Sequence, residues 1–275
     1  MSSDSPVLVD FDEGIAWVTL NRPEKRNAMN PALNETMVRV LDELEGDDRC
    51  QVLVLTGAGD SFSAGMDIKE YFRDVEAAEN PTISLIRARR ASSQWQWKWL
   101  SMWSKPTIAM VNGWCLGGAF IPLVACDLAV AAEEAQFGIA DVNWGIPPGG
   151  ILTKSLSAVM SQRDALYYIM TGENFDGRAA QRMGVVNEAV PREELRTRTR
   201  ELALKLASKN PYVLRASKVG YRHASQMAWD QAEDYLYAKV EQTQHLDPER
   251  SRVNGMKQFL DEKSFRPGLG NLRRP

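Results

Sequence analysis

The sequence predicts an α/β fold of repeated strand–strand–helix units, followed by an all-helical C-terminal region. Short apolar runs rich in β-branched residues alternate with helical patterns along most of the 275-residue chain. Strands that alternate with helices favour a parallel sheet. From Pro191 onward the pattern is almost wholly helical. We therefore expect a mixed core that holds the active site over residues 1–205 and a helical region over residues 206–275, a kind of segment that often caps a core or builds an oligomer interface.

The first elements follow from local patterns. Two strand-like runs around an Asp-Glu-Gly turn predict a hairpin, and a polar, basic loop follows it. Asn30-Pro31 then places a capping residue before a proline in the first turn, and Gly46 is a typical stop. The expected elements are strands at 7–11 and 15–20, a loop at 21–30, a helix at 31–45 and a strand at 52–56.

Two glycine turns follow strands, and together they predict a site for an anionic oxygen. The first is Ser63-Ala64-Gly65-Met66-Asp67; the second, Gly117-Gly118, lies between a strand at 107–111 and a short buried helix at 119–125. Glycine lets the backbone approach a ligand closely, and the first N–H groups of a helix have no intrahelical partner. The amides of Met66 and Gly118 could therefore point at one oxygen, such as a thioester carbonyl that becomes an enolate. The alternative is glycines that are needed only for close packing.

A long helix is expected over residues 84–103, after a flexible-looking stretch at 75–81. Trp95, Trp99 and Trp103 recur at four-residue spacing, which favours a packed core or a subunit contact over a base-stacking platform. The cluster Arg87, Arg89 and Arg90 is more typical of a solvated helix face than of a phosphate contact.

The loop at 139–150 carries a single acid, Asp141, beside Trp144 and a Pro-Pro-Gly-Gly turn. It follows strands at 128–131 and 136–138. Beyond it, Ser161 and Asp164 resemble a capping box, and Gly172 is a typical helix end. The remaining expected elements are helices at 149–160, 161–171, 176–183, 192–208, 211–224, 229–246 and 250–263, a strand at 185–190, and an irregular tail at 265–275.

Composition excludes several classes of function. A net charge of −3 gives no general affinity for nucleic acid or for a membrane surface, and no apolar run is long enough to span a bilayer. Three cysteines without a CxxC pair indicate buried thiols in a reducing, cytoplasmic compartment, not zinc ligands or disulfides. Only two histidines are present, both in polar helical stretches, which disfavours histidine-based nucleophilic catalysis. Residues 1–7 show no signal peptide.

Linked motifs identify a family. NRPEKRNAM, FSAGMDIKE, VNGWCLGGAF and GIPPGG resemble the crotonase (enoyl-CoA hydratase/isomerase) superfamily from about residue 8 to 265. Within it, GMDIKEYFRDV, QWQWK, VNWGIPPGG and EDYLYAK are most similar to the hydroxycinnamoyl-CoA hydratase-lyases. The resemblance implies crotonase-like ββα units, a C-terminal trimerisation region, and homotrimers or hexamers made of two trimers. It also implies conversion of feruloyl-, caffeoyl- or 4-coumaroyl-CoA to a hydroxybenzaldehyde and acetyl-CoA, without metal or other cofactor.

The resemblance carries functional residues onto this chain. The two oxyanion-hole amides fall on Met66 and Gly118, in agreement with the glycine turns. Two tyrosines that surround the substrate's phenolic hydroxyl match Tyr71 and Tyr237, the latter from a neighbouring subunit; taken alone, both residues are more typical of packing. The family's contacts to the CoA moiety fall on Lys25, Ala64, Ile68, Ala140 and Trp144. The charges of Lys25 and Arg26 also suit CoA phosphates, the alternative being solvated charges of a loop.

Two positions depart from the family pattern. Where this chain has Ile121, hydratases place glutamate and the hydratase-lyases usually place a small hydroxyl residue. Where it has Asp141, both hydratases and lyases carry glutamate. One acid therefore remains, shorter by a methylene, and Ile121 cannot hold or protonate water. We expect Asp141 to act as the general base, and the two-acid hydratase mechanism is disfavoured.

Two other functions stay open at this stage. The first is another one-acid crotonase-type enzyme, either an enoyl-CoA isomerase or a hydratase without lyase activity. The second is a non-catalytic RNA-binding member, for which the Arg87–Arg90 cluster is the only support and against which the net charge argues.

Overall fold

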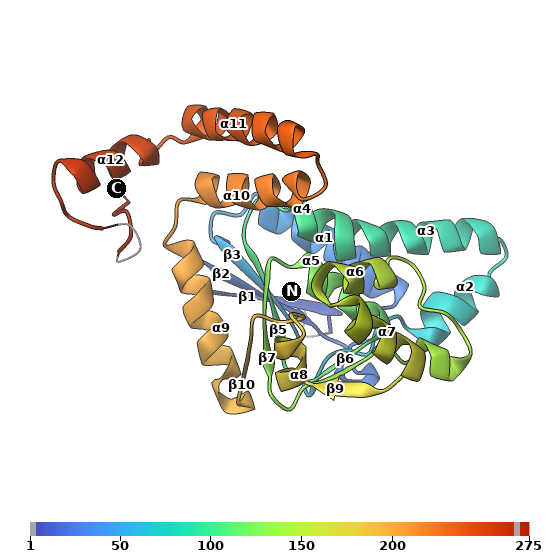
Figure 1. The fold of residues 1–275 in the computed structure, drawn as a ribbon. Coiled ribbons are helices and arrows are strands. Elements are labelled where there is room, and N and C mark those ends of the chain that lie inside the picture. Colours follow the sequence, from blue (N-terminus) through green and yellow to red (C-terminus); the bar gives the residue numbers. More distant parts are fainter. Residues whose placement is uncertain (1–3, 267–269, 275) are drawn as a thin grey trace. The chain divides into compact units, whose positions relative to one another are not determined.

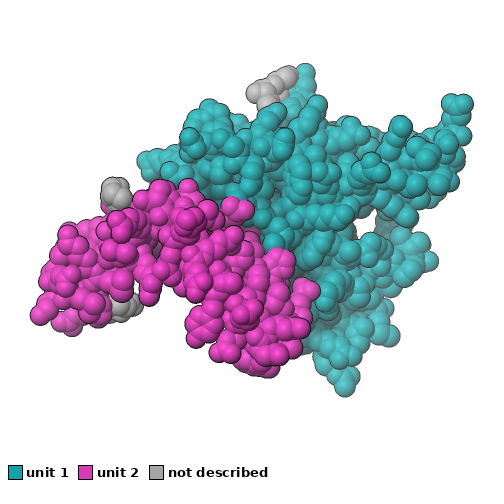
Figure 2. All heavy atoms as spheres, turned by 90° about the horizontal axis from the view of Figure 1, so that it is seen from above, with its two compact units in different colours: residues 1–204 teal, residues 205–275 magenta. Residues whose placement is uncertain are grey.

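The computed structural model describes residues 4–266 and 270–274. The chain forms two compact units, Met1–Leu204 and Lys205–Pro275, which Figure 2 shows in different colours. Two expectations fall partly outside the described residues. Residues 1–3 belong to the stretch in which no signal peptide is expected, and residues 267–269 and 275 belong to the expected irregular tail.

A six-stranded sheet runs through the first unit, with helices packed around it (Figure 1). Its outer hairpin is antiparallel, and every later pair of neighbouring strands is parallel. The two central strands are buried along their whole length, which is why they read as continuous apolar runs in the sequence. In spatial order the strands are β1 (Val7–Asp12), β2 (Ile15–Leu20), β3 (Val52–Gly57), β5 (Thr107–Val111), β7 (Leu128–Ala132) and β10 (Glu188–Val190).

A smaller sheet contains the second strand of each strand–strand–helix unit. β3, β5 and β7 pair in the large sheet, and the short strand that follows each of them pairs in the small one. The expected repetition of ββα units is therefore confirmed. The small sheet consists of β4 (Ser61–Ser63), β6 (Trp114–Leu116), β8 (Gln136–Gly138) and β9 (Asn174–Asp176).

Helix ends follow the capping pattern that the sequence predicts. Asn30 accepts a hydrogen bond from the Leu33 N–H (2.8 Å) at the start of α1, and Gly46 ends this helix. Ser161 accepts one from the Asp164 N–H (3.1 Å) at the start of α7. The α-helices of the first unit are α1 (Pro31–Glu45), α2 (Asp74–Glu76), α3 (Pro81–Ser93), α4 (Leu100–Met102), α5 (Phe120–Ala125), α6 (Leu152–Val159), α7 (Gln162–Thr171), α8 (Gly177–Arg182) and α9 (Arg192–Ala207).

The long helix expected over residues 84–103 is interrupted. After α3 the chain forms a π-helical segment, η3 (Gln94–Trp99), before the single turn of α4. Trp95 and Trp99 lie in η3, whereas Trp103 lies beyond the end of α4, so the three tryptophans do not belong to one continuous helix. Trp95 and Trp103 are buried, whereas Trp99 is half-buried. A second π-helical segment, η2 (Ile68–Arg73), directly follows the first glycine turn.

Other boundaries differ by a few residues. α6 begins at Leu152 and not at residue 149, and part of the stretch at 75–81 is helical (α2). The strand expected at 185–190 is limited to β10, because only these three residues pair with β7. β9 was not expected: it is three residues long, too short to show a period of its own.

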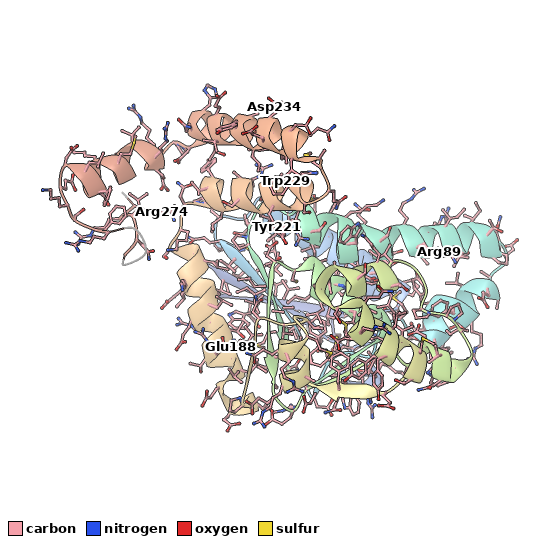
Figure 3. All side chains as sticks on the ribbon, viewed as in Figure 1. Arg89, Glu188, Tyr221, Trp229, Asp234 and Arg274 are labelled. Atoms are coloured by element: carbon pink, nitrogen blue, oxygen red, sulfur yellow. The ribbon has the colours of Figure 1, made fainter. Side chains whose placement is uncertain are left out.

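The second unit is helical, as the sequence predicts, and consists of α10 (Pro211–Ala224), α11 (Trp229–Leu246) and α12 (Ser251–Leu260). It presents unusually exposed aromatic side chains, among them Tyr221 (77%) and Trp229 (95%), both labelled in Figure 3. Exposed aromatics of this kind are typical of surfaces that meet another molecule.

Candidate active site

The backbone of the turn around Met66 pairs with Met29 on one side. The Met29 N–H donates to the Gly65 carbonyl (2.8 Å), and the Met29 carbonyl accepts from the Asp67 N–H (3.2 Å). In a parallel bridge of this kind, the residue between the two bonded neighbours turns its own N–H and C=O to the opposite side. The Met66 amide therefore points away from Met29 and is left free for a ligand.

Gly118 supplies the second amide. It lies in η4 (Gly117–Ala119), a 3₁₀ turn that leads into α5, where the first N–H groups have no intrahelical partner. A Cβ atom on Gly118 would lie 3.5 Å from the Met66 nitrogen, and one on Gly65 would lie 3.1 Å from the Gly118 nitrogen. The two glycine turns are thus in contact, and their amides can serve a single oxygen.

A partly buried cluster of charges supports the Met66 turn. Arg22 contacts Asp67 (3.0 Å) and Glu70 (2.8 Å) and also donates to the Ala28 carbonyl (2.6 Å). The second Asp67 oxygen accepts from the Glu70 N–H (2.9 Å) and so caps η2. Burial opposes ionisation of Asp67, but the hydrogen bonds from the Glu70 amide and Arg22 outweigh it and lower the pKa of Asp67. The residue directly after Met66 is therefore held as a carboxylate.

The Met66 side chain is held by the π-helical segment η3. Gln96 is buried, and its amide nitrogen lies 3.6 Å from the Met66 sulfur and donates to Asn34 (3.1 Å). Trp95 donates to the same Asn34 oxygen (2.7 Å). This network gives the break in the long helix a role, because it directs Gln96 toward the glycine turn.

Asp141 lies in η5 (Ala140–Trp144), next to the second glycine turn. A Cβ atom on Gly117 would lie 3.6 Å from the Asp141 carboxylate, so this acid is a neighbour of the Gly118 amide. Burial raises the pKa of Asp141, against a smaller opposing effect of its own backbone N–H. A half-buried carboxylate with a raised pKa is a stronger base than an exposed one.

Ile121 and Tyr71, which are expected near the acyl group of the substrate, follow different glycine turns. Ile121 is 9% exposed in α5, one helical turn after Gly118. Tyr71 lies in η2 and packs with Val75 and Ala88 in a small cluster that includes the side chain of Met66. Its hydroxyl is 2.9 Å from the Ser92 hydroxyl. Tyr71 therefore packs beside Met66, the residue expected to supply the first oxyanion-hole amide.

Four of the residues assigned to the CoA moiety, Lys25, Arg26, Ala64 and Ile68, lie in or next to the segments around the first turn. The Ala64 N–H donates to the Arg26 carbonyl (2.8 Å), and the Arg26 guanidinium lies over the ring of Trp114 (5.6 Å). Lys25 and Arg26 are exposed on η1 (Pro23–Lys25) and its end, where cations suit phosphates. Ile68 is 61% exposed. Their role in binding CoA stays a prediction.

Ala140 and Trp144 belong to the Asp141 segment, and Trp144 is 70% exposed. Asn143 donates to the Gly172 carbonyl (3.0 Å) and so ties η5 to the end of α7. Tyr237 is 68% exposed on α11, in the second unit, and its contribution to a neighbouring subunit's site stays a prediction.

Sequence reasoning missed Arg22, Gln96 and Ser92. Asp67 stood in a quoted motif beside Met66, but its partner Arg22 lies 45 positions earlier. Only a pairing between the polar N-terminal loop and the first glycine turn, which the sequence does not reveal, connects them.

Two absences concern the described residues alone. Within residues 4–266 and 270–274, no three His, Cys, Asp or Glu side chains come together as a metal site needs. In the same ranges no helix has both the length and the apolar character to cross a membrane. That the enzyme works without a cofactor stays a prediction.

The fold and this site define a class of protein. The family model described as enoyl-CoA hydratase/isomerase matches residues 10–266, and the chain belongs to this family. It is 57% identical to the hydroxycinnamoyl-CoA hydratase-lyase of Pseudomonas fluorescens, over 98% of this chain and 96% of that protein. It is 33% identical to a short-chain-enoyl-CoA hydratase of Clostridium acetobutylicum, over 82% and 84% of the two chains.

A crystal structure of enoyl-CoA hydratase from Bacillus anthracis has the same fold. It matches with a TM-score of 0.81 at 28% identity and covers 94% of this chain and 96% of that one. The crotonase-like α/β fold that the motifs predict is thus confirmed.

Proposed function

We propose that this protein is a hydratase-lyase that converts 4-hydroxycinnamoyl-CoA thioesters to a hydroxybenzaldehyde and acetyl-CoA. The observation that carries the proposal is the 57% identity to a protein of that name over almost the whole of both chains. The geometry supports it, because the two glycine turns that carry the amides of Met66 and Gly118 are in contact and Asp141 lies beside the second turn.

The first reaction is hydration. The thioester oxygen accepts hydrogen bonds from the amides of Met66 and Gly118, and Asp141 takes a proton from water as the oxygen adds to the β-carbon. The electron pair of the double bond moves to the α-carbon and the carbonyl, and the two amides stabilise the resulting enolate. Protonated Asp141 then returns its proton to the α-carbon, which completes the β-hydroxy thioester.

The second reaction is a retro-aldol cleavage at the same position. Asp141 removes the proton of the β-hydroxyl, the aldehyde C=O forms, and the bond between the α- and β-carbons breaks. Its electron pair becomes the acetyl-CoA enolate, which the same amides hold until it is protonated. One oxyanion hole therefore serves both steps, and Tyr71 and Tyr237 bind the ring's 4-hydroxyl.

One acid suffices for this scheme, whereas a two-acid hydration needs a second acidic side chain. Ile121 occupies that place with an apolar side chain that is almost completely buried. This favours the lyase over a fatty-acyl hydratase.

The decisive assay offers feruloyl-CoA and crotonyl-CoA separately and identifies the products. We expect vanillin and acetyl-CoA from the first and little turnover of the second. A hydrated or isomerised thioester without aldehyde would instead indicate the other one-acid enzyme, and salt-dependent RNA binding without turnover would indicate a binding protein.

Asp141→Ala tests the base. Aldehyde formation should be abolished while thioester binding, measured by calorimetry, survives. Unchanged aldehyde formation would remove Asp141 from this role. Asp141→Glu, which lengthens the side chain toward the family's usual residue, should increase turnover, because a misplacement of about 1 Å can cost about 100-fold.

Assembly and location are part of the same proposal. The exposed aromatics of α10 and α11 support a homotrimer, or a hexamer of two trimers. The three cysteines are buried and form no disulfide with one another, which is consistent with a cytoplasmic enzyme.

A further inference from the structure

The hydrogen bond between Tyr71 and Ser92 has a direction. Ser92 is 6% exposed on α3, and its hydroxyl lies 3.1 Å from the Arg89 carbonyl as well as 2.9 Å from the Tyr71 hydroxyl. A serine has one hydrogen to donate, and a carbonyl can only accept. Both bonds form together only if Ser92 donates to Arg89 and Tyr71 donates to Ser92.

This arrangement determines which further hydrogen bond the Tyr71 hydroxyl can make. Its single hydroxyl hydrogen is used on Ser92, so only the lone pairs of its oxygen remain for another group. Tyr71 and Ser92 are both buried, and water does not readily supply an alternative partner. Tyr71 is thereby an acceptor, although a free tyrosine could donate or accept.

We propose that Ser92 is a specificity-determining positioning residue: it turns Tyr71 into an obligatory acceptor that selects substrates whose ring carries a hydroxyl able to donate. This rests on the proposed function, which places Tyr71 at the substrate's 4-hydroxyl. A 4-hydroxyl donates to Tyr71. A 4-methoxy group has no hydrogen, and its ether oxygen faces the tyrosine lone pairs with nothing between them.

The test measures binding apart from chemistry. Two saturated thioesters, 4-hydroxyphenylpropanoyl-CoA and its 4-methoxy counterpart, are titrated into the full-length protein by calorimetry. The wild-type protein should bind the hydroxyl compound about tenfold more tightly. In Ser92→Ala, Tyr71 is free to donate to either oxygen, so the ratio should fall toward one.

The chain offers a matched control. Ser93 is the next residue, is exposed, and makes the same kind of bond to a carbonyl three residues earlier (Arg90, 3.4 Å). Ser93→Ala should keep the wild-type ratio. Ser92→Cys, close to serine in volume but a weak acceptor, should lower the ratio as the alanine does and serves if Ser92→Ala does not fold.

A double-mutant cycle separates this role from packing. In a Tyr71→Phe background the ratio should already be low, and Ser92→Ala should change it no further. An unchanged ratio in folded Ser92→Ala, or an effect of Ser92→Ala that persists without the Tyr71 hydroxyl, would overturn the inference.

Failure of the proposed function is visible separately. It would appear as no aldehyde from feruloyl-CoA with the wild-type protein, or as a Tyr71→Phe variant with the wild-type binding ratio. If Tyr71→Phe lowers the ratio but Ser92→Ala leaves it unchanged, the site is correct and the role of Ser92 is wrong.

Discussion

The backbone nitrogen of Met66 lies 3.5 Å from the point that a Cβ atom on Gly118 would occupy. Two turns more than fifty residues apart in the sequence therefore meet through their main chains. Because Met29 occupies the other side of the Met66 strand, the amide of Met66 faces the gap that Gly118 leaves open.

Gly65→Ala should disable the oxyanion hole. Gly65 has φ +88, which disfavours any side chain, and its Cβ would lie 2.6 Å from the Leu116 carbonyl oxygen. Relief requires the two turns to separate, and we expect aldehyde formation to fall by about 100-fold or more, with a lower melting temperature. Gly46→Ala is the control: no atom lies within 4 Å of its Cβ, and activity should stay at the wild-type level. Equal activity of the two variants would contradict the proposed hole.

The raised pKa of Asp141 predicts two pH effects. The base must be ionised, so kcat/KM should fall as the pH decreases through a value above the ordinary aspartate pKa of about 3.9. The pH dependence of the folding stability has the opposite sign to that of an acid in a salt bridge. The folded protein holds this proton more tightly than the unfolded chain, so the contribution of Asp141 to folding falls as the pH rises.

Asp141→Asn should therefore be inactive yet as stable as the wild type, or more stable, at pH 7. The difference in melting temperature should vanish in acid, where both side chains are neutral. Thermal denaturation across this pH range checks it. If Asp141→Asn instead loses stability relative to the wild type as the pH rises from acid to neutral, burial is not the cause of the raised pKa of Asp141.

Asp67→Asn should weaken the Met66 turn. The lowered pKa of Asp67 means that its stabilising effect is present above the ordinary aspartate pKa and is lost as the pH falls through the lowered value. We expect a drop in melting temperature at neutral pH that shrinks in acid, and a larger loss in kcat than in KM, because the turn carries a transition-state amide. Asp47→Asn is a control for kcat, since it removes another carboxylate with a lowered pKa, paired with the exposed Arg49, outside the proposed site. An equal loss of kcat in Asp67→Asn and Asp47→Asn would show that the Arg22–Asp67 pair has no special role in catalysis.

Mixing two inactive chains tests the placement of Tyr237. If Tyr237 serves a neighbouring subunit's site, oligomers assembled from Asp141→Ala and Tyr237→Ala chains contain some sites with both residues intact. Activity should then reappear on co-expression, although each variant alone is nearly inactive. No recovery in mixed oligomers would place Tyr237 in the site of its own chain or outside any site.

Much of the fold could be predicted from local chemistry. The side chains of Asn30 and Ser161 cap their helices by accepting from backbone N–H groups only three residues later, and buried strands such as β5 show as continuous apolar runs. The two glycine turns, and the single acid in the loop after β8, were likewise visible because their residue types are required locally.

The remaining features depend on distant contacts. The break at η3 follows no proline or glycine, and its residues Trp95 and Gln96 are directed by hydrogen bonds to Asn34, about sixty positions earlier. The direction of the Tyr71 hydroxyl is decided by a carbonyl on another helix. Interactions of this kind leave no periodic pattern in the sequence.

The short loop that starts at Arg22 has two ends with different tasks. Arg22 clamps the Met66 turn, while Lys25 and Arg26, three and four residues later, are exposed cations suited to the nucleotide end of CoA. A thioester that lacks the nucleotide would make no contact with Lys25 and Arg26. Remote binding energy could then no longer tighten the catalytic amide, so a minimal pantetheine substrate should lose turnover rate and not affinity alone.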